Sequence, residues 1–247
     1  MNEFIALLKN HRSIRQFTDQ QVPENVFSEL VTAAQAASTS SYIQAVSIVQ
    51  INNLQVREQF VELAGGQSYI AGAAEFLVFC ADLSRNSERV EISAGRPADF
   101  AWTEQFLAAT IDVALLAQNF VIAAESIGLG CCYIGGIRND PTKVTELLEL
   151  PTLVYPVFGL CLGYPNQNPE IKPRLPRAAI VHQDKYVPAA LMREVLDGYD
   201  THVRDYYLQR TSGKLDLTWS DQMAKQAQSQ SREFMMNYLN NQGFMKK

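Results

Sequence analysis

The chain has 247 residues, of which 47% are hydrophobic and 19% charged, so it is long enough to bury one sizeable core. Its formal net charge of -5 and its pI of about 5.3 argue against a general nucleic-acid binder, which would carry a basic face. No apolar run approaches the length of a bilayer span, and residues 4–8 are not followed by the cleavage pattern of a signal peptide. We expect a soluble, cytoplasmic protein without nucleic-acid or membrane partners.

A helical pattern over residues 2–9 comes directly before a basic segment, His-Arg-Ser-Ile-Arg at residues 11–15. Arginine forks match phosphate oxygens, so this segment predicts an anion site. A solvated turn with scattered ion pairs explains the same residues equally well. Pro23 then opens a second helix, which ends at the polar loop formed by residues 38–41.

Two strands are predicted over residues 45–51 and 75–81, with a helix over residues 54–63 between them. Residues 85–97 are polar and are expected to form a mobile connection. The longest helical pattern covers residues 99–127 and is apolar nearly all round, so it must be covered on most sides, in the core or at a subunit interface.

A helix over residues 142–148 and a strand over residues 155–162 come next. Strands and helices do not alternate cleanly, which favours a mixed α+β sheet. A proline-rich loop then carries a second basic group, Lys172-Pro173-Arg174. If this group meets residues 11–15, the two would hold the phosphate of a bound cofactor. Residues 188–247 are more polar and helical.

Two further segments are candidates for contact with a flat ligand. Gln67-Ser68-Tyr69 follows a double glycine and offers amide contacts to a ring edge, or it is a turn leading into a helix. Ile134-Gly135-Gly136 allows a backbone to approach a ligand closely, because glycine has no side chain, or it is a bulge.

The sequence contains no serine nucleophile elbow, zinc-binding helix motif, phosphate loop or prominent carboxylate pair. The four cysteines are interpreted as buried cytosolic thiols, adjacent Cys131 and Cys132 among them, and the three histidines lack metal-ligand spacing. We therefore expect no metal, and we expect a cofactor to supply the chemistry.

Several motifs occur in an order that resembles one family along essentially the whole chain. The chain resembles the nitroreductase superfamily and, within it, the oxygen-insensitive NADPH nitroreductases and NADPH–FMN oxidoreductases. The motifs that carry this resemblance are residues 11–18 (His-Arg-Ser-Ile-Arg-x-Phe-Thr), 37–44, Gly65-Gly66-Gln67, 123–130, 133–139, 172–176 and Thr218-Trp219-Ser220.

The resemblance implies a nitroreductase-like α+β fold, with a mixed, mostly antiparallel sheet flanked by helices. It also implies an intertwined homodimer that binds two FMN molecules at the subunit interface. Residues 1–247 would form a single FMN-binding domain, in which the helical extension over residues 188–247 contributes to the dimer and to the nucleotide site.

The family's cofactor-binding residues carry over onto matching positions of this chain. No side chain is implied as an obligatory catalyst, because the flavin N5 carries the hydride, but Arg15 and Lys172 are candidates for electrostatic support of the reduced flavin. The implied FMN-binding residues are His11, Arg12, Ser13, Ile14, Arg15, Thr39, Gln67, Ser68, Tyr69, Tyr133, Ile134, Gly135, Gly136, Lys172, Pro173 and Arg174.

Arg210 matches the arginine that grips the 2′-phosphate of NADPH in this family. Relatives often have a second arginine where this chain has Leu215, and the adjacent Lys214 offers a point charge instead of a fork. Mixed use of NADPH and NADH is therefore an open alternative.

The resemblance implies an FMN-dependent enzyme that reduces nitroaromatics, quinones or flavins by ping-pong hydride transfer. The alternatives are a dedicated NAD(P)H–FMN reductase that supplies free reduced flavin and, more remotely, a flavin-binding protein without turnover. Arg210 favours an enzyme, because storage needs no nucleotide site.

Overall fold

The structure, a computed structural model, describes residues 2–228 and 232–247. The chain divides into two compact units, of which residues 1–169 and 232–247 form the first and residues 170–231 the second. The boundary lies in the proline-rich loop, upstream of residue 188, where the sequence placed the start of the helical extension.

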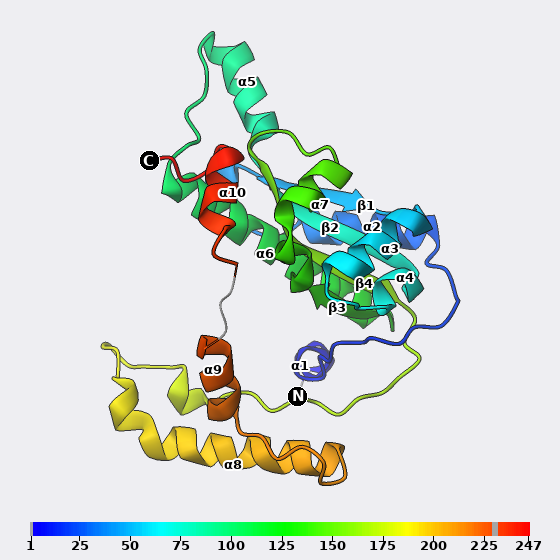
Figure 1. The fold of residues 1–247 in the computed structure, drawn as a ribbon, viewed down its shortest axis with the longest axis vertical. Helices are drawn as coiled ribbons and strands as arrows, with labels where there is room; N and C mark the ends of the chain where they lie inside the picture. The colour runs from blue at the N-terminus through cyan, green and yellow to red at the C-terminus, as the bar shows by residue number, and fades with distance from the viewer. Residues whose placement is uncertain (1, 229–231) are drawn as a thin grey trace. The chain divides into compact units, whose positions relative to one another are not determined.

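Among the described residues, a four-stranded sheet forms the centre of the first unit (Figure 1). Every neighbouring pair of strands is antiparallel. The second and fourth strands are almost entirely buried because helices cover both faces, which is why their sequences form unbroken apolar runs. The predicted α+β class with a mostly antiparallel sheet is confirmed. The strand order is β1-β2-β4-β3, with β1 at Val46–Gln50, β2 at Glu75–Asp82, β3 at Gly130–Ile134 and β4 at Val154–Gly163.

Helices cover the two faces of the sheet with two separate apolar clusters. On one face, Phe120 contacts the edges of Phe27 and Phe79, with ring centroids 6.2 and 6.0 Å apart. On the other face, Phe60 and Phe76 pack edge to face at 5.1 Å. The first face is covered by α2 (Glu24–Gln35) and α6 (Thr103–Ser126), and the second by α3 (Leu54–Leu63), α4 (Tyr69–Gly72) and α7 (Pro141–Leu147).

Helix α6 is apolar on its buried side and also on part of its exposed side. Leu107, Ile111 and Leu115 recur every four residues and are 47%, 52% and 42% exposed. By length and composition α6 could cross a membrane, with a mean hydropathy of 1.8 in its most apolar window. The expectation that no apolar run approaches that length was therefore wrong for this helix, although its buried side packs on the sheet as a core helix does.

Residues 85–97 do not form the mobile connection expected from their polarity, because Ser84–Ala94 forms helix α5. The Asp82 carboxylate accepts the Ser84 N–H at 3.0 Å, which satisfies one of the free donors of the first turn. Gly95 ends the helix with φ of +63°, a left-handed conformation that glycine adopts without strain.

The ends of the first unit are helical as well. Residues 2–9 were expected to form a helix, and α1 spans Glu3–Lys9, while α10 spans Met235–Asn241. The side chain of Tyr238 in α10 hydrogen-bonds to Thr145 at 2.7 Å, so this last helix packs against the first unit. Short 3-10 segments lie at η1 (Ser40–Tyr42) and η2 (Gly135–Asn139).

The second unit is built on two helices, α8 (Arg193–Arg210) and α9 (Trp219–Gln228). Tyr199 of α8 contacts the Trp219 ring at 5.9 Å, and its hydroxyl donates to the Pro173 carbonyl at 3.1 Å. This one side chain therefore ties α8 to α9 and to the proline-rich loop. The 3-10 segments η3 (Arg177–Ala179) and η4 (Ala189–Met192) precede α8.

The guanidinium of Arg57 in α3 hydrogen-bonds to the chain segments that follow β1 and precede β2. It is 7% exposed and donates to the carbonyls of Ile51, Ala73 and Ala74 at 2.6, 2.7 and 3.1 Å. Burial lowers the pKa of Arg57, and the charge of Glu75 opposes this effect. Three carbonyls that lie away from water are thus satisfied by one fork.

We predict that Arg57→Lys lowers the free energy of unfolding by about 1.5–3 kcal/mol, because an ammonium cannot reach all three carbonyls and at least one charge-assisted hydrogen bond is lost. Urea unfolding measures this difference. Arg204→Lys is the matched control, since the Arg204–Asp216 ion pair is exposed and screened by water and should contribute little to stability. Equal losses in the two variants would contradict the structural role of Arg57.

Candidate functional site

The basic segment at residues 11–15 runs along the outer edge of β3. The Ile14 N–H donates to the Cys131 carbonyl at 2.9 Å, and further along the Thr18 N–H donates to the Tyr164 carbonyl at 2.9 Å. Because β3 is an end strand, its outward carbonyl groups need a partner outside the sheet. These backbone bonds fix the register of the segment, and with it the position of each basic side chain.

Ile14 anchors this segment in the core. Its side chain is 5% exposed and lies so close to the backbone of Gly130 that a Cβ there would be 2.6 Å from Ile14 Cγ1. The next residue, Arg15, is exposed. Both residues are among those implied to bind the cofactor. Ile14 offers only its backbone to a ligand, while Arg15 offers its guanidinium.

His11 and Arg12 are held by other parts of the first unit. His11 Nδ1 lies 2.6 Å from Glu125 Oε1, so the ring's Nε2 faces away from that carboxylate. Arg12 donates to Asn168 Oδ1 at 2.5 Å and to the Pro169 carbonyl at 3.1 Å. These contacts orient both side chains before any ligand binds. The third polar residue, Ser13, is half-buried.

Arg15, Gln67, Tyr69 and Cys132 form one polar cluster, which we call the Arg15 cluster. The Tyr69 hydroxyl donates to Gln67 Oε1 at 2.5 Å, and Gln67 Nε2 donates to the Ala64 carbonyl at 2.9 Å. Burial raises the pKa of Tyr69, as does the nearby Cys132, whereas a hydrogen bond and charge from Arg15 lower it. Burial also raises the pKa of Cys132, and the charge of Arg15 opposes that rise.

Gly135 and Gly136 lie next to this cluster in η2. A Cβ on Gly136 would be 2.8 Å from the Ala64 carbonyl oxygen, so only glycine allows η2 to pack against the end of α3. The guanidinium of Arg232 donates to the Gly135 carbonyl at 3.1 Å and to Asn139 Oδ1 at 2.9 Å. The double-glycine segment is therefore held from two sides.

The remaining implied residues near β3 offer mainly backbone. Ile134 is fully buried, and the Tyr133 ring packs on Phe158 at 5.0 Å, on the face of the sheet opposite to Cys132. Burial raises the pKa of Tyr133. Ser68 is exposed at the N-terminus of α4.

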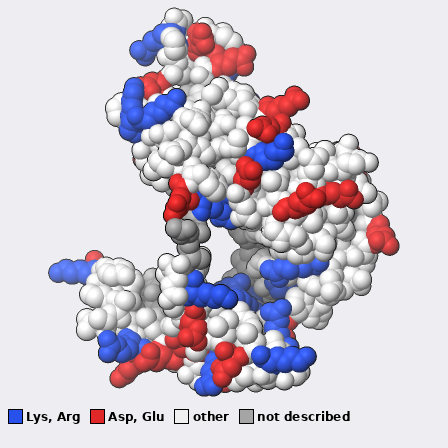
Figure 2. Space-filling view, viewed as in Figure 1, with Lys and Arg blue, Asp and Glu red and all other residues white. Residues whose placement is uncertain are grey.

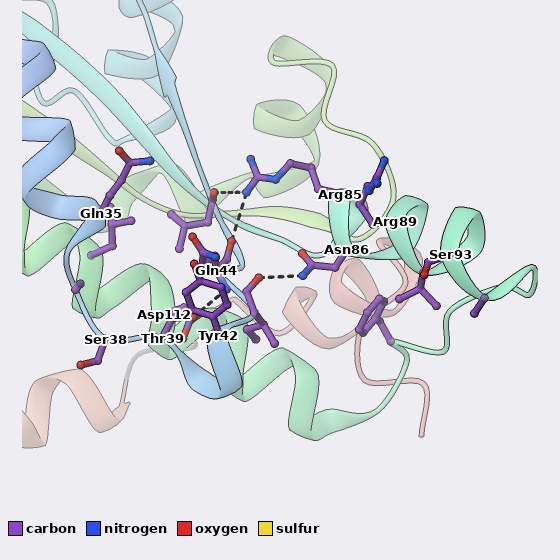
Figure 3. Close-up of a pocket in the computed structure, with 17 residues that line it drawn as sticks. Gln35, Ser38, Thr39, Tyr42, Gln44, Arg85, Asn86, Arg89, Ser93 and Asp112 are labelled. Atoms are coloured by element: carbon purple, nitrogen blue, oxygen red, sulfur yellow. Dashed lines mark hydrogen bonds between the residues drawn. The ribbon is translucent and has the colours of Figure 1, made fainter.

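Thr39 lies at a different place in the first unit. Its hydroxyl donates to the carboxylate of Asp112 in α6 and accepts from the Gln44 N–H, 2.9 Å away. Together with α5 these residues line a cavity of about 1120 Å³, shown in Figure 3. The structure thus brings Arg15, Gln67 and Tyr69 together and places Thr39 apart from them, at the cavity beside α5.

The other basic residues belong to the second unit. Lys172 Nζ lies 5.4 Å from the centroid of the Tyr207 ring, and Arg174 donates to the Lys172 carbonyl at 2.9 Å. Arg210 donates to the Tyr206 hydroxyl at 3.1 Å, one helical turn away. Lys214 follows in the turn after α8, where its N–H donates to the Thr211 carbonyl at 3.2 Å. That Lys172 and Arg174 meet residues 11–15 stays a prediction.

Sequence reasoning missed three charged residues that orient the implied site residues: Asp112 at Thr39, Glu125 at His11, and Arg232 at Gly135. One signal was available for Asp112, because it is the only charged residue within the apolar stretch 111–124. A charge in such a stretch is costly to bury unless it is hydrogen-bonded, so it indicates a specific partner.

The antiparallel sheet between helical layers, with a glycine-rich turn and a basic segment at the β3 edge, defines a member of the nitroreductase family. Residues 8–164 match the model of the nitroreductase family, and residues 172–247 match that of the family's C-terminal domain. The chain belongs to this family.

Individual relatives match the whole chain. It is 44% identical to the FMN reductase (NADPH) of Bacillus subtilis over 248 residues, covering 100% of both chains. It is also 44% identical to the oxygen-insensitive NADPH nitroreductase of Salmonella typhimurium, covering 99% of each. The solved structure of NfrA1 from B. megaterium superposes with a TM-score of 0.96 at 42% identity, covering 99% of this chain and 100% of that one.

We predict that Gly136→Ala lowers the free energy of unfolding by about 1–3 kcal/mol, because its Cβ would meet a backbone oxygen that cannot move aside. Gly135→Ala is the neighbouring control, since its nearest contact is the end of the Arg138 side chain at 3.4 Å. Thermal or urea unfolding compares the two variants. A larger loss in Gly135→Ala than in Gly136→Ala would contradict this packing of η2.

Proposed function

We propose that this chain is an FMN-dependent oxidoreductase that takes electrons from NADPH, and also from NADH, and reduces nitroaromatics, quinones or flavins. The observation that carries the proposal is the Arg15 cluster beside Gly135 and Gly136. This cluster lies in a chain that is 44% identical, over its full length, to a protein named FMN reductase (NADPH).

The residues of the Arg15 cluster fit a flavin mononucleotide. FMN carries an anionic phosphate, a flat ring and a polar ring edge, and the cluster offers an exposed guanidinium and a side-chain amide beside the Gly135–Gly136 backbone. Charges of both signs are interspersed on the face drawn in Figure 2, and the net charge is -5. Binding of an anionic cofactor therefore depends on local guanidinium groups rather than on the field of the whole molecule.

FMN, when bound, supplies the two-electron transfer between the nucleotide and the acceptor. The chain's own residues bind and orient it. Arg15 would supply a positive charge to the negative charge that develops on reduction, and Lys172 of the second unit is proposed for the same role. Gln67 is held by Tyr69 and Ala64, so its amide is oriented before the cofactor arrives. No side chain of the cluster is required as an acid, since water can supply protons.

The dimer expected for this family is also part of the proposal. Leu107, Ile111 and Leu115 of α6 form an exposed apolar stripe that a second copy of the chain would cover. A dimer also accounts for Thr39, which lies at a separate cavity within one chain and would be supplied to the FMN site by the partner. We further propose a cytoplasmic location, in keeping with four free, buried cysteines.

For the nucleotide, we propose that Arg210 holds the 2′-phosphate of NADPH and that Lys214 assists it. With Leu215 at the position of the usual second arginine, only one fork faces the phosphate. This arrangement favours NADPH while leaving NADH usable, because both nucleotides share every group except that phosphate.

The absorbance of the purified protein tests the proposal as a whole. A yellow protein that releases FMN on denaturation, and whose colour bleaches with NADPH under anaerobic conditions, is expected. A flavin that NADPH fails to bleach would favour the flavin-binding protein without turnover. Because one relative is named FMN reductase and another nitroreductase, turnover with free FMN must be compared with turnover on nitrofurazone and a quinone.

We predict that Arg15→Ala raises the Kd for FMN at least tenfold and slows reduction by NADPH, because the exposed guanidinium would be lost from the cluster. Fluorescence quenching of FMN by apoprotein measures the affinity, and stopped-flow absorbance measures the rate. Lys143→Ala is the control, since it removes one surface charge in α7, paired with Glu146. Full FMN content with an unchanged reduction rate in Arg15→Ala would overturn this assignment.

We predict that Arg210→Ala raises the KM for NADPH at least tenfold and leaves the KM for NADH nearly unchanged, because only NADPH carries the 2′-phosphate. Leu215→Arg should lower the KM for NADPH by offering a second fork. Steady-state kinetics with each nucleotide and one fixed acceptor measures both effects. Equal increases for NADPH and NADH in Arg210→Ala would show that the residue does not read the phosphate.

A further inference from the structure

The turn that contains Thr39 has an unusual backbone. Ser41, Tyr42 and Gln44 have φ of +47°, +62° and +49°, a region that L residues with side chains rarely adopt. Residues in this region are strained, so the turn persists only because its surroundings hold it. The result is that the Tyr42 side chain stands 79% exposed at the cavity of Figure 3.

Asp112 holds the two ends of this turn together. Its carboxylate is 2% exposed and accepts the Thr39 hydroxyl, the Ser40 N–H at 2.8 Å and the Ala45 N–H at 3.3 Å. These donors come from both sides of the strained residues. A buried carboxylate needs hydrogen-bond donors, and the turn supplies them only in this conformation.

Helix α5 holds the same turn from the other side. Arg85 donates to the carbonyl of Val46 at 2.6 Å, and Asn86 Nδ2 donates to the carbonyl of Ile43 at 2.9 Å. Figure 3 shows these bonds reaching the turn from α5 while Asp112 lies on the side of α6. The turn's backbone N–H groups therefore donate to Asp112, and side chains of α5 donate to the turn's carbonyls. Both the donors and the acceptors of this backbone are satisfied.

The contact with Asp112 also decides what Thr39 can do. A hydroxyl has one proton and two lone pairs. The proton is given to Asp112 and one lone pair accepts the Gln44 N–H. Thr39 therefore faces a ligand only as an acceptor, for an N–H or O–H group, and it cannot donate to a phosphate oxygen.

We propose that Asp112 is a positioning residue of the FMN site: it holds residues 39–45 in the strained shape in which Thr39 accepts a hydrogen bond from the cofactor bound at the partner subunit's Arg15 cluster. This proposal rests on the proposed FMN-dependent function. Asp112 acts through the turn and touches neither cofactor nor substrate.

Asp112→Asn tests the proposal, because an amide replaces one acceptor oxygen with a donor that faces other donors. The Kd of apoprotein for FMN should rise at least tenfold, and amide hydrogen exchange should accelerate in the peptide covering residues 39–46. Glu75→Gln is the matched control, since Glu75 is 9% exposed and bonded to Gln50 Nε2 at 2.8 Å, away from the turn. A wild-type Kd in Asp112→Asn, or equal weakening in both variants, would overturn the proposal.

If Asp112→Asn fails to fold, variants at Thr39 carry the test. Thr39→Val removes the hydroxyl that bridges Asp112 and Gln44, so FMN affinity should fall and exchange at residues 39–46 should accelerate. Thr39→Ser should restore both. Where Asp112→Asn folds, the double variant with Thr39→Val should bind FMN no more weakly than the worse single variant. Additive losses, or a serine variant as weak as the valine variant, would overturn the coupling.

Mixed dimers separate this proposal from the proposed function. If wild-type protein binds no FMN, the proposed function fails, whereas wild-type binding with an unaffected Asp112→Asn variant removes only the role of Asp112. Subunits carrying Arg15→Ala mixed with subunits carrying Asp112→Asn should regain one intact site per mixed dimer, because each chain supplies the part that the other lacks. A mixture that binds no FMN would overturn the placement of the turn at the partner's site.

Discussion

The edge pairing between Ile14 and Cys131 is the contact on which the position of the site depends. An end strand presents unpaired backbone groups, and here the segment after α1 takes them up, with Ile14 buried where only Gly130 leaves room. Because backbone register fixes the direction of every side chain, anchoring Ile14 directs the neighbouring Arg15 outwards to Tyr69 and Cys132. The pairing with the sheet edge, rather than the composition of the basic segment, therefore determines where its charged side chains point.

Local pattern predicted most of the elements, because most of them are stabilised by an apolar face. The helix over residues 54–63 has the same bounds in the structure, and the strand at 75–81 lies within β2. Helix α5 was missed because its residues are largely polar and none is buried. It is held by the Asp82 carboxylate at its start and by the bonds of Arg85 to the 44–46 backbone, which no local pattern contains.

In the candidate site, too, some residues could be predicted from local sequence while others depend on contacts made only in the fold. The order of motifs predicts which residues face a cofactor, because the cofactor's chemistry requires those residue types. The residues that orient them are remote in sequence: Asp112 lies 73 positions from Thr39, Glu125 lies 114 from His11, and Arg232 lies 97 from Gly135. Any acidic or basic residue of a single sequence could fill such a role, so only the fold selects the partner.

Helix α6 connects the proposed interface to the turn that this interface would present. Ile111 belongs to the exposed apolar stripe, and the next residue, Asp112, is buried and holds the strained turn. Since adjacent positions of a helix point about 100° apart, one rigid helix would face a partner with one residue while it fixes the shape of the turn with the next. In the proposed dimer, packing of the stripe would thereby set where Thr39 and Tyr42 reach the other subunit. A shift of α6 would move this proposed interface and the turn together, and would thus couple assembly of the dimer to completion of each proposed cofactor site.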